Sequence, residues 1–189
     1  MKNGKQVCLI LHNIRSAYNV GSIFRTADAA GVNKIYICGY SPTPLEHFQK
    51  GNVRANDFTS QNRFSRYDSK ISKTALGAEC FISWEYYRQT WRLMEKLKKE
   101  GVQVIALEQS KKSVDFRKFK PKFPIALVVG NEIRGLSKEI LKRANKIIAI
   151  PMYGQKESLN VSVAAGIAIY RLMEGISAGG ISPRRTFLR

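Results

Sequence analysis

Short apolar runs alternate with helical patterns along the chain, and this alternation most restricts the fold. The apolar runs are rich in β-branched residues, which is typical of strands buried on both faces. They cover residues 7–11, 34–38, 80–83, 102–107, 125–129 and 147–150. The helical patterns cover residues 20–30, 85–99, 137–144 and 159–174. Strands that alternate with helices predict an α/β fold, in which a mainly parallel sheet is flanked by helices on both faces.

The length of 189 residues fits a single domain of this kind over residues 1–180. Residues 181–189 are predicted to form a disordered tail. Residues 40–79 interrupt the alternation and are predicted to be a long basic loop inserted into the domain.

An excess of positive charge indicates a polyanionic partner. Lys and Arg number 32 against 14 Asp and Glu, which gives a formal net charge of +18. Such a field attracts polyanions. Nucleic acid is the first candidate, an anionic membrane is the second, and charge that serves solubility alone is the third.

The sequence predicts a cytoplasmic protein with no membrane partner and no metal. No apolar run approaches the roughly 18 residues that cross a bilayer, and no cleavage site follows the short run 7–11. Cys8, Cys38 and Cys80 are far apart, so we expect buried, reduced thiols. Two histidines without a C-x-x-C pair do not suggest a metal site.

Two basic segments are candidates for RNA contacts. In residues 40–79, Arg and Lys lie among Phe and Tyr, a mixture that suits phosphate binding with base stacking. A solvated loop whose aromatic side chains pack on the sheet explains this segment equally well. In residues 111–122, half of the residues are basic, which suits phosphate contacts or a soluble connection. The candidate RNA-binding residues of the two segments are Lys50, Arg54, Arg63, Arg66, Lys111 and Lys112.

The common nucleotide-binding motifs are absent from the sequence. Neither G-x-G-x-x-G after the first strand nor G-x-x-x-x-G-K-[ST] occurs. Their absence argues against dinucleotide enzymes, P-loop NTPases and the common Rossmann-type methyltransferases.

The first of three informative blocks, residues 19–28 (NVGSIFRTAD), follows the first predicted strand. Gly21 permits close approach of a ligand or a partner helix. Asn19 suits a helix cap, and Arg25 lies nearly two helical turns later. A cap and a solvated arginine would explain this block without any further function.

The second block, residues 129–137 (VGNEIRGLS), directly follows a buried strand. It therefore lies at the carboxyl end of the sheet, where open α/β folds bind ligands. Its two glycines permit tight turns, and Ser137 is a good helix cap. The alternative is an ordinary strand–helix connection with Glu132 exposed.

The third block joins residues 150–154 (IPMYG) to residues 158–166 (SLNVSVAAG). A strand ends at Pro151, and a helix rich in small residues begins near Ser158. Small residues permit close packing between helices. The alternative is an internal helix for which Ser158 and Asn160 are caps and nothing more.

Together, the three blocks resemble the SpoU/TrmH family of the SPOUT RNA 2'-O-ribose methyltransferases. Asn19 and Arg25 match its first motif, Gly130, Glu132 and Gly135 match its second, and residues 158–164 match its third. The resemblance covers residues 7–175. It implies a deep trefoil knot over about 103–175 and a homodimer with each active site near the subunit interface.

The resemblance also implies that S-adenosylmethionine is bound by the loops of the knot. By position, the cofactor-binding residues are Leu107, Glu108, Gln109, Val129, Gly130, Asn131, Glu132, Gly135, Ile150, Pro151, Met152, Ser158 and Leu159. The acceptor it implies is a ribose 2'-hydroxyl in tRNA or rRNA. A SPOUT enzyme that methylates a base nitrogen and a non-catalytic RNA-binding protein are the alternatives.

The resemblance implies that Arg25 is the central catalytic residue and that it also contacts the RNA. The residues that would position the reactants around it are Asn19, Glu132, Ser158 and Asn160. Because arginine stays protonated at ordinary pH, a role as general base needs an unusual environment. Arg25 would otherwise hold a phosphate that takes the proton, or stabilise the developing alkoxide.

Overall fold

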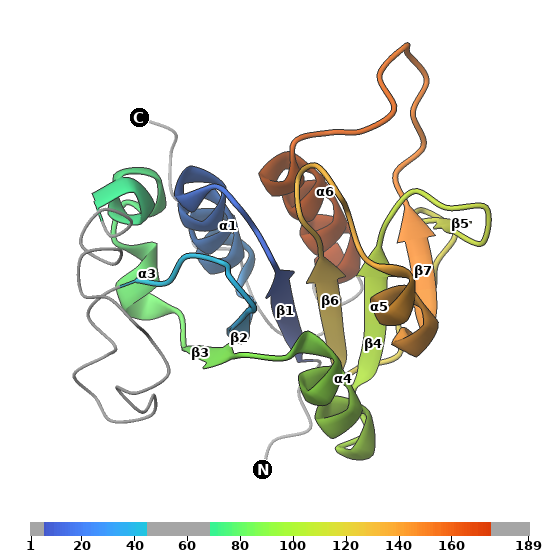
Figure 1. Cartoon of the computed structure of the whole chain (residues 1–189), viewed down its shortest axis with the longest axis horizontal. Helices are drawn as coiled ribbons and strands as arrows, with labels where there is room; N and C mark the ends of the chain where they lie inside the picture. Colours follow the sequence, from blue (N-terminus) through green and yellow to red (C-terminus); the bar gives the residue numbers. More distant parts are fainter. Residues whose placement is uncertain (1–5, 45–68, 175–189) are drawn as a thin grey trace.

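The computed structural model of the chain describes residues 6–44 and 69–174 (Figure 1). The strands are β1 (Val7–His12), β2 (Lys34–Cys38), β3 (Trp84–Tyr87), β4 (Gln103–Leu107), β5 (Val114–Asp115), β6 (Ile125–Val129) and β7 (Lys146–Ala149). The helices are α1 (Ala17–Ala30), α3 (Ala78–Phe81), α4 (Thr90–Lys99), α5 (Lys138–Arg143) and α6 (Val161–Glu174). Residues 69–75 are also helical.

The described strands form one sheet in the order β3-β2-β1-β6-β4-β7-β5. Every neighbouring pair is parallel, which confirms the predicted parallel sheet. The carboxyl ends of β4, β6 and β7 consequently lie at one edge of the sheet, next to the amino end of α6 (Figure 1). Strand order alone does not define a knot, so the trefoil knot over 103–175 stays a prediction.

Helices cover both faces of the sheet, as the apolar strands predict. On one face, α1 and α6 pack with residues 69–75 and α3 on a large buried cluster that includes Phe24, Ile71 and Ile169. On the other face, α4 and α5 bury Leu93 and Ile140 against the sheet. A strand such as β6, which is buried along its whole length, lies between these two layers.

The close approach predicted for Gly21 occurs between two helices. A Cβ atom at this position would collide with Thr74 Oγ1 and the carbonyl oxygen of Ile71. A side chain there would push α1 away from the helix at residues 69–75. Gly21 therefore serves helix packing within the chain.

The ends of two helices confirm the capping predictions in part. Gly31 ends α1 in a left-handed conformation, and Ser137 caps α5 by accepting a hydrogen bond from Ile140 N–H. The prediction that Asn19 caps α1 is wrong. Ser16 is the cap, and Asn19 lies in the first turn of the helix.

The stretch from residue 78 to residue 89 differs most from the sequence prediction. Gly77, with φ of 89°, precedes the short helix α3 where a strand over 80–83 is expected. The predicted helix 85–99 is confirmed only from Thr90, where α4 begins, because residues 84–87 form the strand β3. Aromatic side chains favour strands, and Tyr87 packs edge-on against Tyr36 of β2 at 5.8 Å.

The helix α3, found where a strand is expected, affects the prediction that all three cysteines are buried. Cys38 is buried, and burial raises the pKa of its thiol to about 12. Burial also raises the pKa of the half-buried Cys8, with the Lys34 charge opposing it. Cys80 is exposed on α3, so the expectation of a buried thiol is wrong there.

The long loop predicted over 40–79 is also wrong at its carboxyl end, because residues 69–75 and α3 are helical. The RNA-binding candidates Lys50, Arg54, Arg63 and Arg66 lie outside the described residues, as does the predicted tail 181–189. Among the helices that the structure describes, none is long and apolar enough to cross a membrane.

Candidate functional site

A cavity of about 180 Å³ lies at the carboxyl ends of β4, β6 and β7. Its walls come from the loops that follow these strands and from the start of α6. Its lining residues are Leu107, Glu108, Gln109, Val129, Gly130, Asn131, Glu132, Ile133, Gly135, Ala149, Ile150, Met152, Ser158, Leu159, Val161 and Ala164. Every residue predicted to bind the cofactor lines this cavity except Pro151.

Four lining residues were not among the predicted cofactor-binding residues: Ile133, Ala149, Val161 and Ala164. Ala149 is the last residue of β7, and Ala164 lies in the first turn of α6. Their small or apolar side chains carry no chemical signal. Ile133, Val161 and Ala164 lie within the second and third blocks, and Ala149 directly precedes the third, which is the only hint that the sequence offers.

A tight turn at residues 130–135 forms one wall of the cavity. Gly135 N–H donates to the Asn131 carbonyl at 2.8 Å, and Gly135 has φ of 62°. A Cβ at Gly130 would lie 2.8 Å from the carbonyl carbon of Gly135, so only glycine fits without a shift of the turn.

Glu108 holds this turn against β4. Its Oε2 accepts a hydrogen bond from Leu136 N–H at 2.6 Å, and its Oε1 accepts one from Gln109 N–H at 2.9 Å. A Cβ at Gly135 would collide with the same carboxylate. Both carboxylate oxygens of this predicted cofactor-binding residue thus accept backbone hydrogen bonds within the chain.

Asn131 ties the turn to the loop after β1. Its Oδ1 accepts hydrogen bonds from Ile133 N–H and Arg134 N–H, at 3.0 and 2.9 Å. Its Nδ2 donates to the Asn13 carbonyl at 2.9 Å and to the Tyr40 hydroxyl at 3.1 Å. The Asn131 side chain is buried, and these bonds satisfy it without a ligand.

Glu132 joins the second motif to the first. Its Oε2 accepts a hydrogen bond from Arg15 N–H at 2.8 Å. Its Oε1 accepts bonds from Ser16 N–H at 3.0 Å and Asn19 Nδ2 at 2.8 Å. The carboxylate thus lies at the amino end of α1, where the helix dipole favours negative charge. Glu132 is half-buried, so the alternative of an exposed residue is wrong.

The pKa of Glu132 reflects these bonds. Burial raises it, but the hydrogen bonds from Arg15, Asn19 and Ser16 together outweigh burial and hold the pKa below its ordinary value. The side chain is therefore a carboxylate at neutral pH. It acts as an acceptor that fixes the first turn of α1.

Asn160 extends the chain of contacts to the third motif. Its Nδ2 donates to Asn19 Oδ1 at 3.1 Å, while its Oδ1 accepts from the backbone and the hydroxyl of Ser162 at 2.9 and 2.7 Å. Asn160 is thus more than a cap of α6. Ser158 is exposed and lines the cavity two residues before it, ahead of the helix start at Val161. Asn160, Asn19 and Glu132 form one hydrogen-bonded chain through all three motifs.

Arg25 is exposed on α1 and does not line the cavity. It lies six residues after Asn19, which places it about 9 Å farther along the helix axis. Its guanidinium makes no hydrogen bond or ion pair with another residue in 6–44 or 69–174. A single chain therefore does not place Arg25 at the predicted cofactor site.

Two RNA-binding candidates lie close to the cavity in sequence. Lys111 and Lys112 are exposed in the turn that follows the lining residues Glu108 and Gln109. Across 6–44 and 69–174, no group of three or more His, Cys, Asp or Glu side chains is arranged to hold a metal ion.

Comparison with known proteins identifies the family. The SpoU rRNA Methylase family matches residues 51–170. The tRNA (guanosine(18)-2'-O)-methyltransferase of Aquifex aeolicus is 34% identical over 169 residues, which cover 89% of this chain and 69% of the relative. The enzyme with the same name from Escherichia coli K12 is 28% identical over 164 residues, covering 87% of this chain and 60% of the relative.

A solved structure agrees with these sequences. The AdoMet-bound rRNA methyltransferase from Sinorhizobium meliloti superposes with a TM-score of 0.74 at 26% identity, covering 90% of this chain and 57% of that one. The chain thus spans about three fifths of the length of the S. meliloti and E. coli proteins. From its motifs, its parallel sheet and these matches, the chain belongs to the SpoU rRNA methylase family.

Proposed function

We propose that the chain transfers the methyl group of S-adenosylmethionine to a ribose 2'-hydroxyl of tRNA or rRNA. The observation that carries this proposal is the hydrogen-bonded chain of Asn160, Asn19 and Glu132, which joins the three motifs beside the cavity. Relatives named tRNA (guanosine(18)-2'-O)-methyltransferase and AdoMet-bound rRNA methyltransferase support it. We place the protein with its RNA in the cytoplasm.

The cavity suits a donor that combines apolar and polar parts. Leu107, Ile150 and Leu159 offer apolar contacts, while the turn at 130–135 exposes backbone groups. Glycine at position 130 keeps this turn tight, because a Cβ there would collide with Gly135. When bound, S-adenosylmethionine supplies a methyl group activated by the adjacent sulfonium. The loops at 107–109, 129–135 and 150–152 would hold and orient it.

In this proposal, Arg25 acts on the RNA that accepts the methyl group. As a permanent cation, it binds the phosphate next to the target ribose, or it stabilises negative charge on the 2'-oxygen as the proton leaves. Because it does not line the cavity of its own chain, we place it beside the cavity of a partner subunit. Asn19 and Asn160 keep the first turn of α1 next to α6, and so orient the segment that leads to Arg25.

A homodimer supplies that partner. The exposed side of α6 carries apolar residues at helical spacing, which mark a contact surface rather than a solvated one. They are Val163, Ile167 and Tyr170, with Leu159 just before the helix and Tyr18 exposed on α1. We propose that a second copy of the chain covers this face.

Light scattering after gel filtration tests the dimer. The wild-type chain is expected to elute with twice its monomer mass. Replacing Ile167 with Glu places a charge in the proposed contact and is expected to yield a monomer, whereas Arg88→Glu, on an exposed residue outside α1 and α6, leaves the dimer intact. A wild-type monomer at assay concentrations contradicts the proposal.

Transfer of a labelled methyl group into RNA tests the activity. The purified chain is incubated with methyl-labelled S-adenosylmethionine and with total tRNA or rRNA, and the RNA is digested to nucleosides. We expect label in a 2'-O-methylated nucleoside, which protects the adjacent bond from alkali. Label in a base instead indicates the base-nitrogen alternative. Binding to RNA without donor binding or transfer indicates a non-catalytic protein.

A further inference from the structure

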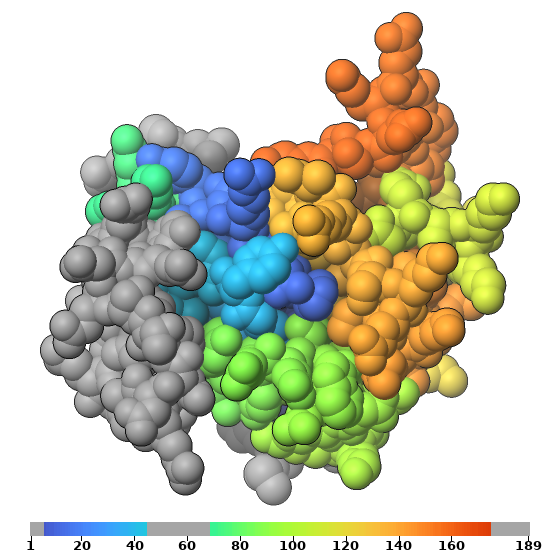
Figure 2. Space-filling model, in the orientation of Figure 1, coloured from blue at the N-terminus to red at the C-terminus, as the bar shows by residue number. Residues whose placement is uncertain are grey.

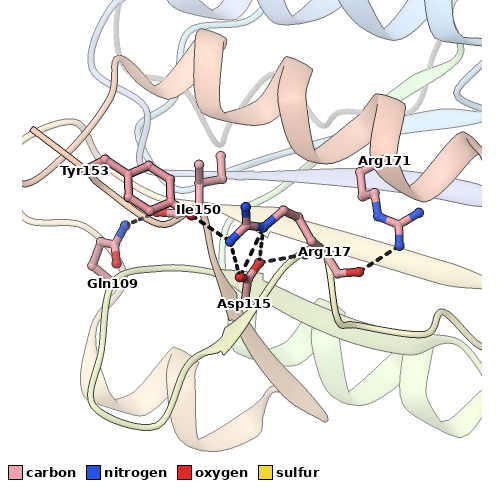
Figure 3. A network of polar contacts seen from close by, with 6 residues as sticks. All are labelled: Gln109, Asp115, Arg117, Ile150, Tyr153 and Arg171. Carbon is pink, nitrogen blue, oxygen red and sulfur yellow. Dashed lines mark hydrogen bonds and ion pairs between the residues drawn. The ribbon is translucent and has the colours of Figure 1, made fainter.

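One polar network lies at the edge of the cavity and joins the third block, through Ile150 and Tyr153, to residues outside the three blocks (Figure 3). The Asp115 carboxylate accepts hydrogen bonds from Arg117 N–H, Nε and Nη2, the last at 2.6 Å. The same Nη2 donates to the Tyr153 hydroxyl at 2.7 Å. Asp115 ends β5, and Tyr153 lies in the loop after β7, so Arg117 bridges two segments that are 36 residues apart. We call these three side chains the strut.

The position of Arg117 is itself fixed from two sides. The pKa of Asp115 is lowered to about 2, first by the hydrogen bonds from Arg117, so the pair stays charged at any assay pH. Arg171 of α6 donates from Nη2 to the Arg117 carbonyl at 2.8 Å. The strut thus connects the edge strand β5 and helix α6 to the loop.

The loop that Tyr153 belongs to forms a wall of the cavity. Ile150 and Met152 line the cavity, and residues 150–160 form no helix or strand. Gln109 Nε2 donates to the Ile150 carbonyl at 2.6 Å. Within the described part of the chain, this bond and the Arg117–Tyr153 bond are the only hydrogen bonds of residues 150–153. Met152 therefore lies between two residues, Ile150 and Tyr153, that are each held by one hydrogen bond.

The rest of the loop extends away from the body of the molecule and is exposed on several sides (Figures 1 and 2). Residues 153–160 are all exposed, and Tyr153 is 82% exposed. Packing therefore contributes little to holding the loop near Tyr153. In a segment with so few contacts, a single side-chain hydrogen bond contributes strongly to keeping the loop in one conformation.

We propose that Arg117 is a positioning residue for the methyl donor, which acts through Tyr153 by fixing the wall at Met152. This inference rests on the proposed function, because it assigns the cavity to the donor. The Arg117 side chain is 54% exposed, so its ion pair with Asp115 adds little to global stability. Its effect is expected in the order of the loop and in donor affinity, and not in the unfolding temperature.

A direct contact between Arg117 and RNA is the competing role, since Arg117 lies in the basic segment 111–122. The two roles differ in what Tyr153→Phe does, because this change removes only the hydroxyl that Arg117 binds. A strut predicts that both variants weaken donor binding, with Arg117→Ala at least as damaging as Tyr153→Phe, because the guanidinium also lies 5.8 Å from the centre of the Tyr153 ring. The double variant should be no worse than Arg117→Ala. An RNA contact predicts little effect of Tyr153→Phe.

Donor binding and loop opening test the strut together. In Arg117→Ala and in Tyr153→Phe, we expect the Kd and KM for S-adenosylmethionine to rise by about five- to tenfold. The kcat and the KM for RNA should stay within about twofold of wild type. Trypsin cleavage after the exposed Lys156 should become several-fold faster in both variants. Arg88→Ala removes an equal charge from an exposed residue and serves as the control that leaves all these values unchanged.

Three outcomes of these measurements would contradict the proposed function or the role of the strut. A wild-type chain that binds no S-adenosylmethionine overturns the proposed function and the strut with it. A wild-type chain that binds the donor, with an unchanged donor Kd and an unchanged Lys156 cleavage rate in Arg117→Ala, overturns the strut alone. A rise confined to the KM for RNA assigns Arg117 to RNA contact and overturns the strut as well.

Discussion

Replacing Arg25 with alanine is expected to lower the rate of methyl transfer by about 10³-fold while S-adenosylmethionine binding stays within about twofold of wild type. The separation follows from geometry. Arg25 is exposed on α1 and lines no part of the cavity of its own chain, and beside the partner's cavity its proposed contacts are with the RNA, so its loss leaves the donor contacts in place. Single-turnover transfer of labelled methyl to RNA gives the rate, and calorimetry gives the donor affinity.

Two further variants separate the shape of the Arg25 side chain from its charge. Arg25→Lys keeps the positive charge but loses the planar fork that binds a phosphate through two hydrogen bonds, so it should recover only part of the rate. Arg88→Ala controls for the lost charge. An Arg25→Ala variant with wild-type activity would remove this residue from the reaction.

Replacing Glu132 with alanine is expected to damage both stability and activity. The change leaves Arg15 N–H, Ser16 N–H and the Asn19 amide without their acceptor. Because water reaches this half-buried site, we expect a loss of about 2 kcal/mol in the free energy of unfolding. For a chain of this size, that loss lowers the Tm by about 4–8 °C. Methyl transfer should fall further than stability, because Asn19 loses the contact that orients it.

The pH dependence of this loss follows from the lowered pKa of Glu132. A carboxyl whose pKa is lowered by folding stabilises the folded state above its ordinary pKa, which is 4.5 for Glu. That stabilisation disappears as the pH falls through the lower pKa of the folded state. The difference in unfolding free energy between wild type and Glu132→Ala should therefore be constant above about pH 6 and shrink below pH 4.5. Urea unfolding at several pH values measures it, and a difference that grows on acidification contradicts the assignment.

The regular parts of the fold were predictable because their signals are local. Runs such as 125–129 are apolar on both faces, which in an α/β pattern means a central parallel strand. Gly31 and Ser137 act within one turn of their own helices. The cavity residues came from the resemblance to the SpoU/TrmH family, carried over by position, and the parallel sheet brings their loops to one edge.

Other features depend on contacts that no local pattern contains. Residues 84–87 directly precede a stretch of helical periodicity, and pairing with β2 fixes them as a strand. Asn19 looks like a helix cap because its acceptor, Glu132, is 113 residues away in sequence. The bridge from Arg117 to Tyr153 likewise joins two loops whose sequences show no relation.

The central claim is that the loops after β4, β6 and β7 form the donor site, and an NMR titration of the wild-type chain with S-adenosylmethionine tests it most directly. We predict that amide signals shift at residues 107–109, 129–135 and 150–152 and at Leu159, while signals of α4 and α5 helix positions facing solvent stay in place. Absence of any shift at saturating donor, or shifts gathered on α4 and α5 alone, would contradict the claim.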